Sequence, residues 1–123
     1  MKSMKYIIGF CVLLCFTPPV QAQKALIRQA GKHYEAHNFD RPSKLWIKAF
    51  HLTNEQQDRK ELAFRIGSAF HRMNQFEKAL QWYADANGND GNNPDWLLAQ
   101  ADAYLKLNQV TAARNLTEKV LKL

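Results

Sequence analysis

Apolar and polar residues alternate along most of the chain with the period of amphipathic helices. Between residues 63 and 83 the small and apolar positions lie three and four residues apart, on both sides of a short polar segment: Ala63, Ile66, Gly67, Phe70, Phe76, Ala79, Leu80 and Tyr83. This spacing places them on one face of a helix before the polar segment and of a second helix after it. We therefore predict two antiparallel helices that approach closely at Gly67 and Ala79.

The same unit occurs three times. Each unit has a small residue, an aromatic residue one turn later, a polar turn with asparagine, an apolar residue nine positions after the small one, and a closing small or β-branched residue. These positions hold Ala30, Tyr34, Asn38, Phe39 and Ala49; Gly67, Phe70, Asn74, Phe76 and Ala86; and Ala101, Tyr104, Asn108, Val110 and Val120. Because one helix hairpin cannot bury its own apolar face, we expect the three hairpins to stack.

Helix-boundary signals separate the units. Thr53–Gln56 has the composition of a capping box, so the first helix of the second unit is predicted to begin near Asn54. Asn87–Gly88 is typical of a left-handed helix stop, and Asn93–Pro94 supplies an N-cap and a first helical residue. The repeats are therefore expected at about residues 23–53, 54–90 and 94–123.

These repeats resemble the tetratricopeptide repeat (TPR) family, whose period of 34 residues separates the second unit from the third. The first unit is weaker because it has Pro42 where the family usually has alanine, although a proline is tolerated in the first turn of a helix. The resemblance implies an all-α solenoid of three helix hairpins, about six helices, over residues 23–123. It also implies a protein that holds other proteins and is not an enzyme.

The N-terminal segment has the features of a secretory signal peptide. Lys2 and Lys5 are followed by an uncharged, mostly apolar run over residues 6–16, two prolines, and a small-x-small site at Val20–Ala22. The run is shorter than the roughly 20 apolar residues that a membrane-spanning helix needs. We therefore predict that residues 1–22 are removed, and that no membrane span is left after cleavage.

Removal of this segment changes the composition of the chain. The formal net charge falls from +6 to +4, and both cysteines, Cys11 and Cys15, are lost, so no disulfide or thiolate site is expected. The basic residues that stay are scattered, whereas nucleic-acid binding needs clustered positive charge. The sequence therefore argues against a nucleic-acid partner.

No residue pattern indicates catalysis, a cofactor or a metal. His33 and His37 are four residues apart, but a zinc site needs three or four ligands and no third is in register. His71 is adjacent to Arg72 and is no obvious ligand or base. No nucleophile elbow, phosphate-binding loop or dinucleotide fingerprint occurs. A tryptophan platform for a small ligand is the alternative to packing at three positions: Trp46, Trp82 and Trp96.

The TPR resemblance implies a binding groove on the concave face that the first helices of the hairpins form. Apolar residues rimmed by charge on this face are typical of a partner-binding surface. The groove positions carried over to this chain are Tyr34, Glu35, Glu61, Phe64, Ser68, His71, Arg72, Leu98, Asp102, Leu105 and Lys106. Ile27 and Gly31 replace the residues with which chaperone-type TPR domains clamp a C-terminal carboxylate, so that ligand is disfavoured.

An export signal before TPR units resembles the opening of OmpA-like, peptidoglycan-linked secretion proteins of Bacteroidota. We expect an adaptor in the periplasm or at the outer-membrane periphery of a Gram-negative bacterium. Two alternatives stay open: a fragment of such a larger protein, or a small-ligand-binding accessory of an enzyme. Leu116, Val120 and Leu121 predict that the last helix docks on a partner or on a second copy.

The signal-peptide hypothesis predicts a mature chain that begins at Gln23, because signal peptidase cuts after a small-x-small site. Mass spectrometry of the exported protein measures the N-terminus directly. A chain that retains residues 1–22 after export would instead favour an N-terminal anchor.

Overall fold

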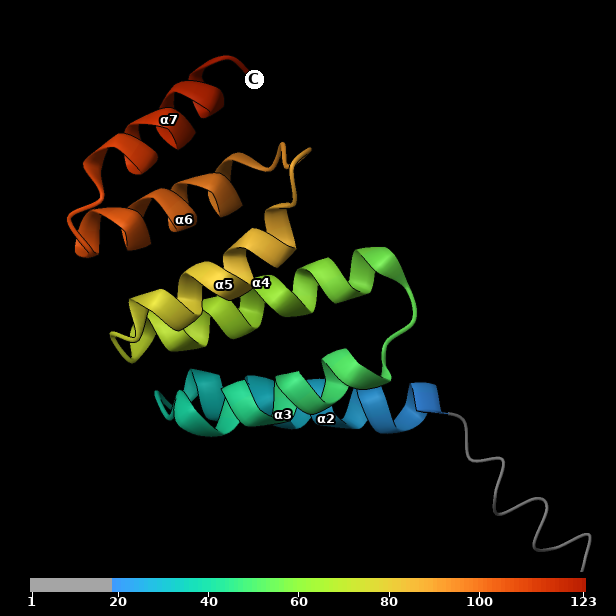
Figure 1. Cartoon of the computed structure of the whole chain (residues 1–123). Helices are drawn as coiled ribbons and strands as arrows, with labels where there is room; N and C mark the ends of the chain where they lie inside the picture. The colour runs from blue at the N-terminus through green and yellow to red at the C-terminus, as the bar shows by residue number, and fades with distance from the viewer. Residues whose placement is uncertain (1–18) are drawn as a thin grey trace, which may run out of the picture.

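The computed structural model describes residues 19–123, and it contains six α-helices and no strand in that range (Figure 1). The helices are α2 (Pro19–Glu35), α3 (Asp40–Leu52), α4 (Gln56–Arg72), α5 (Phe76–Asn87), α6 (Pro94–Lys106) and α7 (Val110–Leu121). The all-α fold and the number of helices predicted from the sequence are confirmed. Most of the predicted signal peptide lies outside the described residues, and the bond after Ala22 falls inside the first turns of α2.

The six helices form three antiparallel hairpins that stack in one direction. The turns within the hairpins lie along one edge of the stack and the connections between hairpins lie along the other (Figure 1). Each helix packs on its neighbours in the chain, and α4 also contacts α6. In this part of the chain, no helix combines the length and the apolar character that a membrane crossing requires.

Each hairpin turns through the same backbone geometry. One residue with positive φ ends the first helix, and it is His37 (60°), Asn74 (58°) or Asn108 (59°). The N–H of this residue donates a hydrogen bond to the carbonyl three residues earlier. The N–H of the following residue donates to the carbonyl five residues before it, and the two bonds together form a Schellman motif. In the first hairpin the turn residue is therefore His37 and not Asn38, which the sequence alignment had placed one residue too late. Histidine is among the non-glycine residues that are enriched at positive φ.

The two connections between hairpins differ from each other. Asn93 caps α6 as predicted, since its side-chain oxygen accepts the N–H groups of Asp95 and Trp96. The predicted capping box before α4 is wrong, because the buried Thr53 hydroxyl donates 2.7 Å back to the carbonyl of Ala49. Thr53 therefore closes α3, and α4 begins at Gln56 without a side-chain cap.

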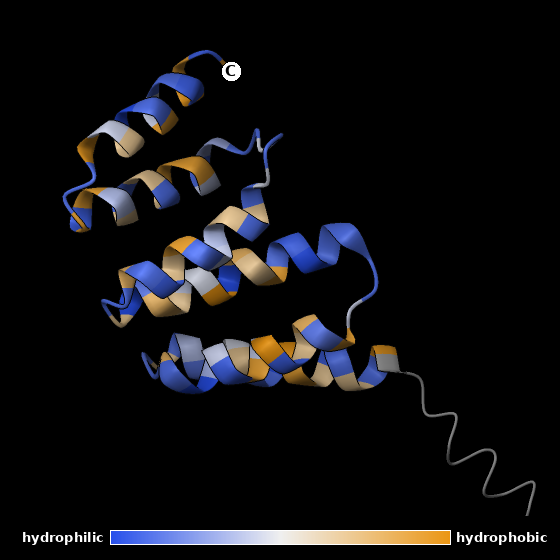
Figure 2. Cartoon of the chain, in the orientation of Figure 1, coloured by the Kyte–Doolittle hydropathy of each residue, from blue (hydrophilic) through white to orange (hydrophobic). Residues whose placement is uncertain are grey.

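The buried core lies between the helices and is rich in alanine. One cluster joins α2, α3 and α4, and a second joins α4, α5 and α6: Ala30, Trp46, Ala49, Leu62, Ile66 and Ala69; and Ala79, Tyr83 and Ala103. No helix in the described range is apolar all round, since each carries both kinds of residue along its ribbon (Figure 2). The core is therefore a series of interfaces between helices, as stacked repeats require.

The helices α4 and α5 approach each other closely at Gly67. A Cβ atom added there would lie 2.6 Å from Cδ1 of Tyr83 and 3.2 Å from the carbonyl oxygen of Ala79. These distances leave no room for any side chain, because a real Cβ is not found within 3.0 Å of such a neighbour. Gly67 therefore lies at the helix crossing that the repeat pattern predicts.

We expect Gly67→Ala to destabilise the fold, because the added methyl must displace the buried ring of Tyr83. Overpacking of this kind costs about 1–3 kcal/mol. Gly31→Ala is the matched control, because a Cβ on Gly31 meets nothing within 4 Å. The control should gain about 0.5–1 kcal/mol from helix propensity alone. Urea unfolding followed by circular dichroism measures both, and equal stability of the two variants would contradict the predicted crossing.

Candidate functional site

Two adjoining depressions lie beside α4 and form one continuous groove. The first, of about 320 Å³, is lined by Gly31, Tyr34, Glu35, Trp46, Phe64, Arg65 and Ser68. The second, of about 280 Å³, is lined by Tyr34, Ser68, His71, Arg72 and Tyr83. Because Tyr34 and Ser68 line both, we treat the two as a single site, which we call the α2–α4 groove.

Small residues open the α2–α4 groove, and aromatic side chains form its base. Gly31 has no side chain, and the space where its Cβ would point is empty. The ring of Tyr34 packs against Trp46 with their centroids 5.6 Å apart, and Trp46 is 4% exposed. The groove therefore offers an apolar floor that is held in place by the packing of α2 on α3.

Phe64 belongs to the core as well as to the groove. Its ring stacks on Trp96 of α6, with 5.0 Å between centroids and an interplanar angle of 11°, and it also contacts Tyr83 of α5 at 5.4 Å. The groove assignment predicts that Phe64 faces solvent, whereas in the structure its side chain is half-buried. A change at Phe64 therefore alters the packing of the third hairpin along with the groove.

His71 connects three helices at the second depression. Its Nδ1 lies 3.0 Å from the hydroxyl of Tyr83 on α5, and its Nε2 lies 2.8 Å from Oδ2 of Asp102 on α6. In a neutral imidazole that fits these partners, Nε2–H donates to the carboxylate and Nδ1 accepts the tyrosine proton. The sequence could not find this arrangement, because the partners are 12 and 31 residues away.

The buried hydroxyl of Tyr83 is a structural group. Burial raises the pKa of Tyr83 to about 12, and a hydrogen bond with the side chain of Ser68 opposes the increase only in part. The phenol therefore stays neutral at physiological pH and cannot serve as a nucleophile or base there. The Tyr83–His71–Asp102 chain holds α4, α5 and α6 together and fixes the shape of the groove wall.

The remaining predicted site residues lie outside the α2–α4 groove. Glu61 borders two other depressions, one of them shared with Trp96. On α6, Leu98 and Leu105 are 44% and 51% exposed, and they line none of the depressions described here. The exposed Lys106 follows them in the last turn of α6. Four further residues line the groove and are not among the positions predicted from the sequence: Gly31, Trp46, Arg65 and Tyr83.

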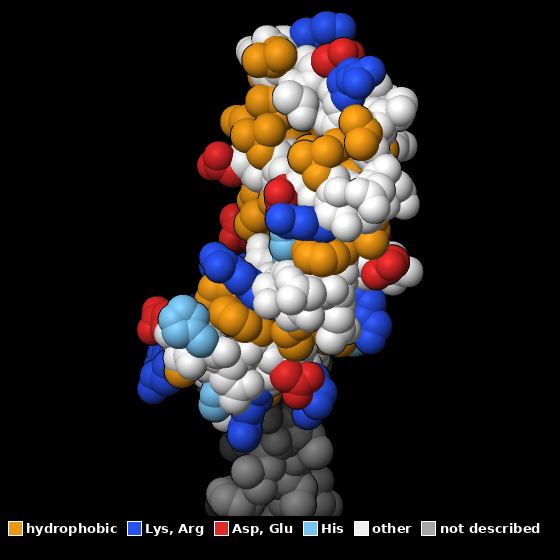
Figure 3. Space-filling model, turned by 90° about the vertical axis from the view of Figure 1, so that its left-hand side faces the viewer, with side chains coloured by type: hydrophobic (Ala, Val, Ile, Leu, Met, Phe, Trp, Pro, Cys, Tyr) orange, Lys and Arg blue, Asp and Glu red, His pale blue; other side chains and the backbone are white. Residues whose placement is uncertain are grey.

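The edge of the stack that carries the hairpin turns shows a mixed surface. Apolar side chains appear at intervals along its whole height and alternate with basic and acidic ones (Figure 3). Among the described residues, no group of three or more histidine, cysteine or acidic side chains is arranged to hold a metal.

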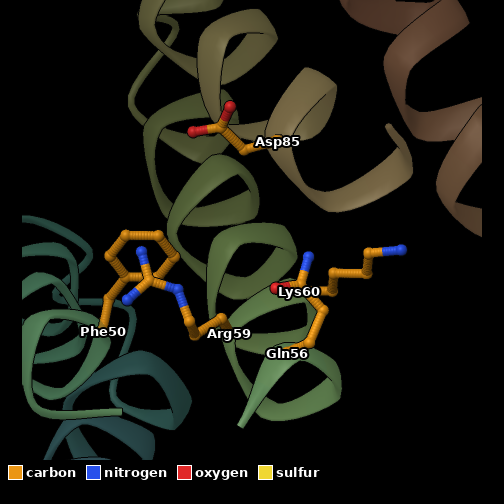
Figure 4. A pocket seen from close by; sticks show the side chains of 5 residues that line it. All are labelled: Phe50, Gln56, Arg59, Lys60 and Asp85. Atoms are coloured by element: carbon orange, nitrogen blue, oxygen red, sulfur yellow. The ribbon is translucent and has the colours of Figure 1, made fainter. Parts of the chain in front are cut away.

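A further depression, of about 340 Å³, is lined by Phe50, Gln56, Arg59, Lys60 and Asp85, but its charged groups do not converge (Figure 4). The guanidinium of Arg59 lies 4.2 Å from the ring centroid of Phe50 and donates 3.1 Å to the carbonyl of Thr53. These contacts tie α4 to the end of α3. In Figure 4 the side chains of Lys60 and Asp85 point away from each other.

The fold places the chain among all-α solenoids of the TPR type, with three hairpins that share one turn geometry and stack through small residues. Among solved structures, the TPR domain of Arabidopsis FLU is similar, with a TM-score of 0.77 over 85% of this chain and 96% of that domain. At 15% sequence identity, this likeness establishes the fold. The sequence matches no protein-family model and no curated protein.

We expect the stability difference between the wild type and Tyr83→Phe to depend on pH. Near pH 8 the variant lacks the hydroxyl that bonds His71 and should be about 1 kcal/mol less stable. As the pH rises from 10 towards 12, tyrosine 83 ionises in the unfolded chain before it does in the folded one, so the wild type loses up to about 3 kcal/mol.

The phenylalanine variant has no such group at this position, so the difference should shrink and then reverse at alkaline pH. Urea unfolding of both proteins at about pH 8 and pH 11.5 measures it, and subtraction removes the contribution of the other tyrosines. A difference that stays constant with pH would mean that the Tyr83 hydroxyl is solvated in the folded protein.

Proposed function

We propose that this protein is a non-catalytic adaptor that binds a segment of a protein partner in the α2–α4 groove. The observation that carries the proposal is the open apolar floor of Tyr34, Trp46 and Phe64 beside exposed charges. Apolar centres with a charged rim are typical of protein interfaces. The TPR-like fold supports the same reading, since solenoids of this type present extended binding surfaces.

A small-molecule site fits the groove less well. Binding sites for small molecules are usually enclosed and have a few polar groups that converge on the ligand. Here the polar groups nearest the base are already engaged, since His71 bonds Tyr83 and Asp102. The exposed Glu35, Arg65 and Arg72 are placed to meet an elongated ligand that runs along the surface.

The second part of the proposal is a role in the bacterial envelope. The predicted signal peptide supports export to the periplasm or the outer-membrane periphery, where the adaptor would scaffold an assembly of envelope proteins.

The last helix, α7, is the alternative binding surface. Leu121 on α7 is 81% exposed, but Thr117, at the repeat position of Trp46 and Tyr83, is polar and bonds the carbonyl of Ala113. Self-association through α7 stays a prediction.

Gly31→Leu should block partner binding without unfolding the protein. The leucine side chain would project into empty space on the groove floor, and helix propensity favours it over glycine. A photo-reactive residue at position 35, beside the groove, should cross-link a partner in envelope extracts, and Gly31→Leu should abolish the product.

The same photo-reactive residue at Lys48, an exposed position on α3, is the matched control and should give no product. Circular dichroism must show unchanged helicity in all variants. If the product forms equally well in Gly31→Leu, the partner does not occupy the groove and the proposal is wrong.

A further inference from the structure

We propose that the α2–α4 groove selects a partner helix that carries one apolar side chain between two carboxylates seven residues apart. This inference rests on the proposed function and specifies the chemistry of the partner. It follows from the charges on the side of the groove formed by Arg65, Ser68 and Arg72, which we call the α4 wall, from the spacing of those charges, and from the apolar floor between them.

The α4 wall carries two arginines that are available to a ligand. Arg65 and Arg72 are exposed and line the two halves of the groove, and neither forms an ion pair with any residue in the range 19–123. Ser68, which lines both halves, lies between them. The three residues are spaced i, i+3 and i+7, so they share one face of α4.

The spacing of the two arginines fits a helix better than an extended strand. Seven residues rise about 10.5 Å along a helix, which is two turns. A helix laid alongside α4 has the same rise, so carboxylates at its own positions i and i+7 lie opposite Arg65 and Arg72. In an extended strand the same length takes about three residues, and side chains three apart point to opposite faces. Residues on one face of a strand lie about 7 or 14 Å apart, so a strand matches the spacing of the two arginines less closely than a helix does.

The floor between the arginines fits an apolar side chain. Gly31 and Ser68 are small, so the space above the rings of Tyr34 and Phe64 is open to a leucine or phenylalanine. On a helical ligand this anchor falls at position i+3 or i+4, midway between the carboxylates.

The opposite wall sets the orientation of the acidic residues. Glu35 on α2 is exposed and also forms no ion pair with the described residues, so a carboxylate on that side would be repelled. Asp102 is not free to repel the ligand in the same way, because His71 bonds it at 2.8 Å. The two acidic residues should therefore face α4, and a polar or basic residue should face α2.

The test uses the protein over residues 23–123, which includes all six helices from the predicted cleavage site onwards, and a phage-displayed library of random 16-residue peptides. Binders are selected on the wild type, and the affinity of each is then measured for the wild type and for Gly31→Leu. We expect them to carry two acidic residues about seven positions apart with an apolar residue between them. The double variant Arg65→Glu/Arg72→Glu should lose about fivefold in affinity per arginine for these peptides and should select basic ones instead.

Arg41→Glu/Lys48→Glu is the matched control, because it makes the same charge changes at exposed positions seven residues apart on α3. It should leave peptide affinity unchanged. Binders that need an open Gly31 but ignore the change at Arg65 and Arg72 would overturn this inference and leave the groove function intact. If no selected peptide is sensitive to Gly31→Leu, the groove function itself is wrong.

Discussion

The contact of Tyr83 with Gly67 is the constraint on which the centre of the stack depends. The absence of a side chain at Gly67 lets the tyrosine ring lie directly over the backbone of α4. In that position its hydroxyl meets His71, and His71 in turn reaches Asp102 on the third hairpin. One glycine therefore determines how closely the second hairpin closes and also how the third is attached to it.

The same repeat positions hold different side chains in successive hairpins, and this changes how each hairpin meets the next. Trp46 and Phe50 of α3 present aromatic surface, and Phe50 contacts Trp82 at 5.1 Å and lies under the guanidinium of Arg59. At the position of Phe50, α5 has Asn87, whose amide donates 2.8 Å to the buried Gln100. A buried polar pair tolerates fewer alternative alignments than an apolar surface does, so it defines how α6 lies on α5.

The sequence predicts the elements of this fold much better than it predicts the contacts between them. Small and apolar residues at helical spacing are local signals, and they locate the six helices and the crossing at Gly67. The capping box predicted at Thr53 is wrong, because a hydroxyl between two helices can either cap the next helix or donate to a carbonyl of the previous one. In this structure it donates to the previous helix. The stacking of Phe64 on Trp96 and the bonds of His71 depend on how hairpins lie in space, which no local pattern encodes.

The two helical glycines, Gly31 and Gly67, have different physical reasons: one is required by helix packing, and the other opens the proposed binding groove. A glycine inside a helix costs about 1 kcal/mol relative to alanine, so each needs a physical reason. At Gly67 the reason is the ring of Tyr83, which any side chain would strike. At Gly31 no neighbour lies within 4 Å of the missing Cβ, so packing does not require the glycine. The absence of a side chain at Gly31 leaves the floor of the α2–α4 groove open. Locally unfavourable residues are expected at functional sites, and Gly31 is therefore the residue that most directly connects the energetics of this fold with its proposed binding role.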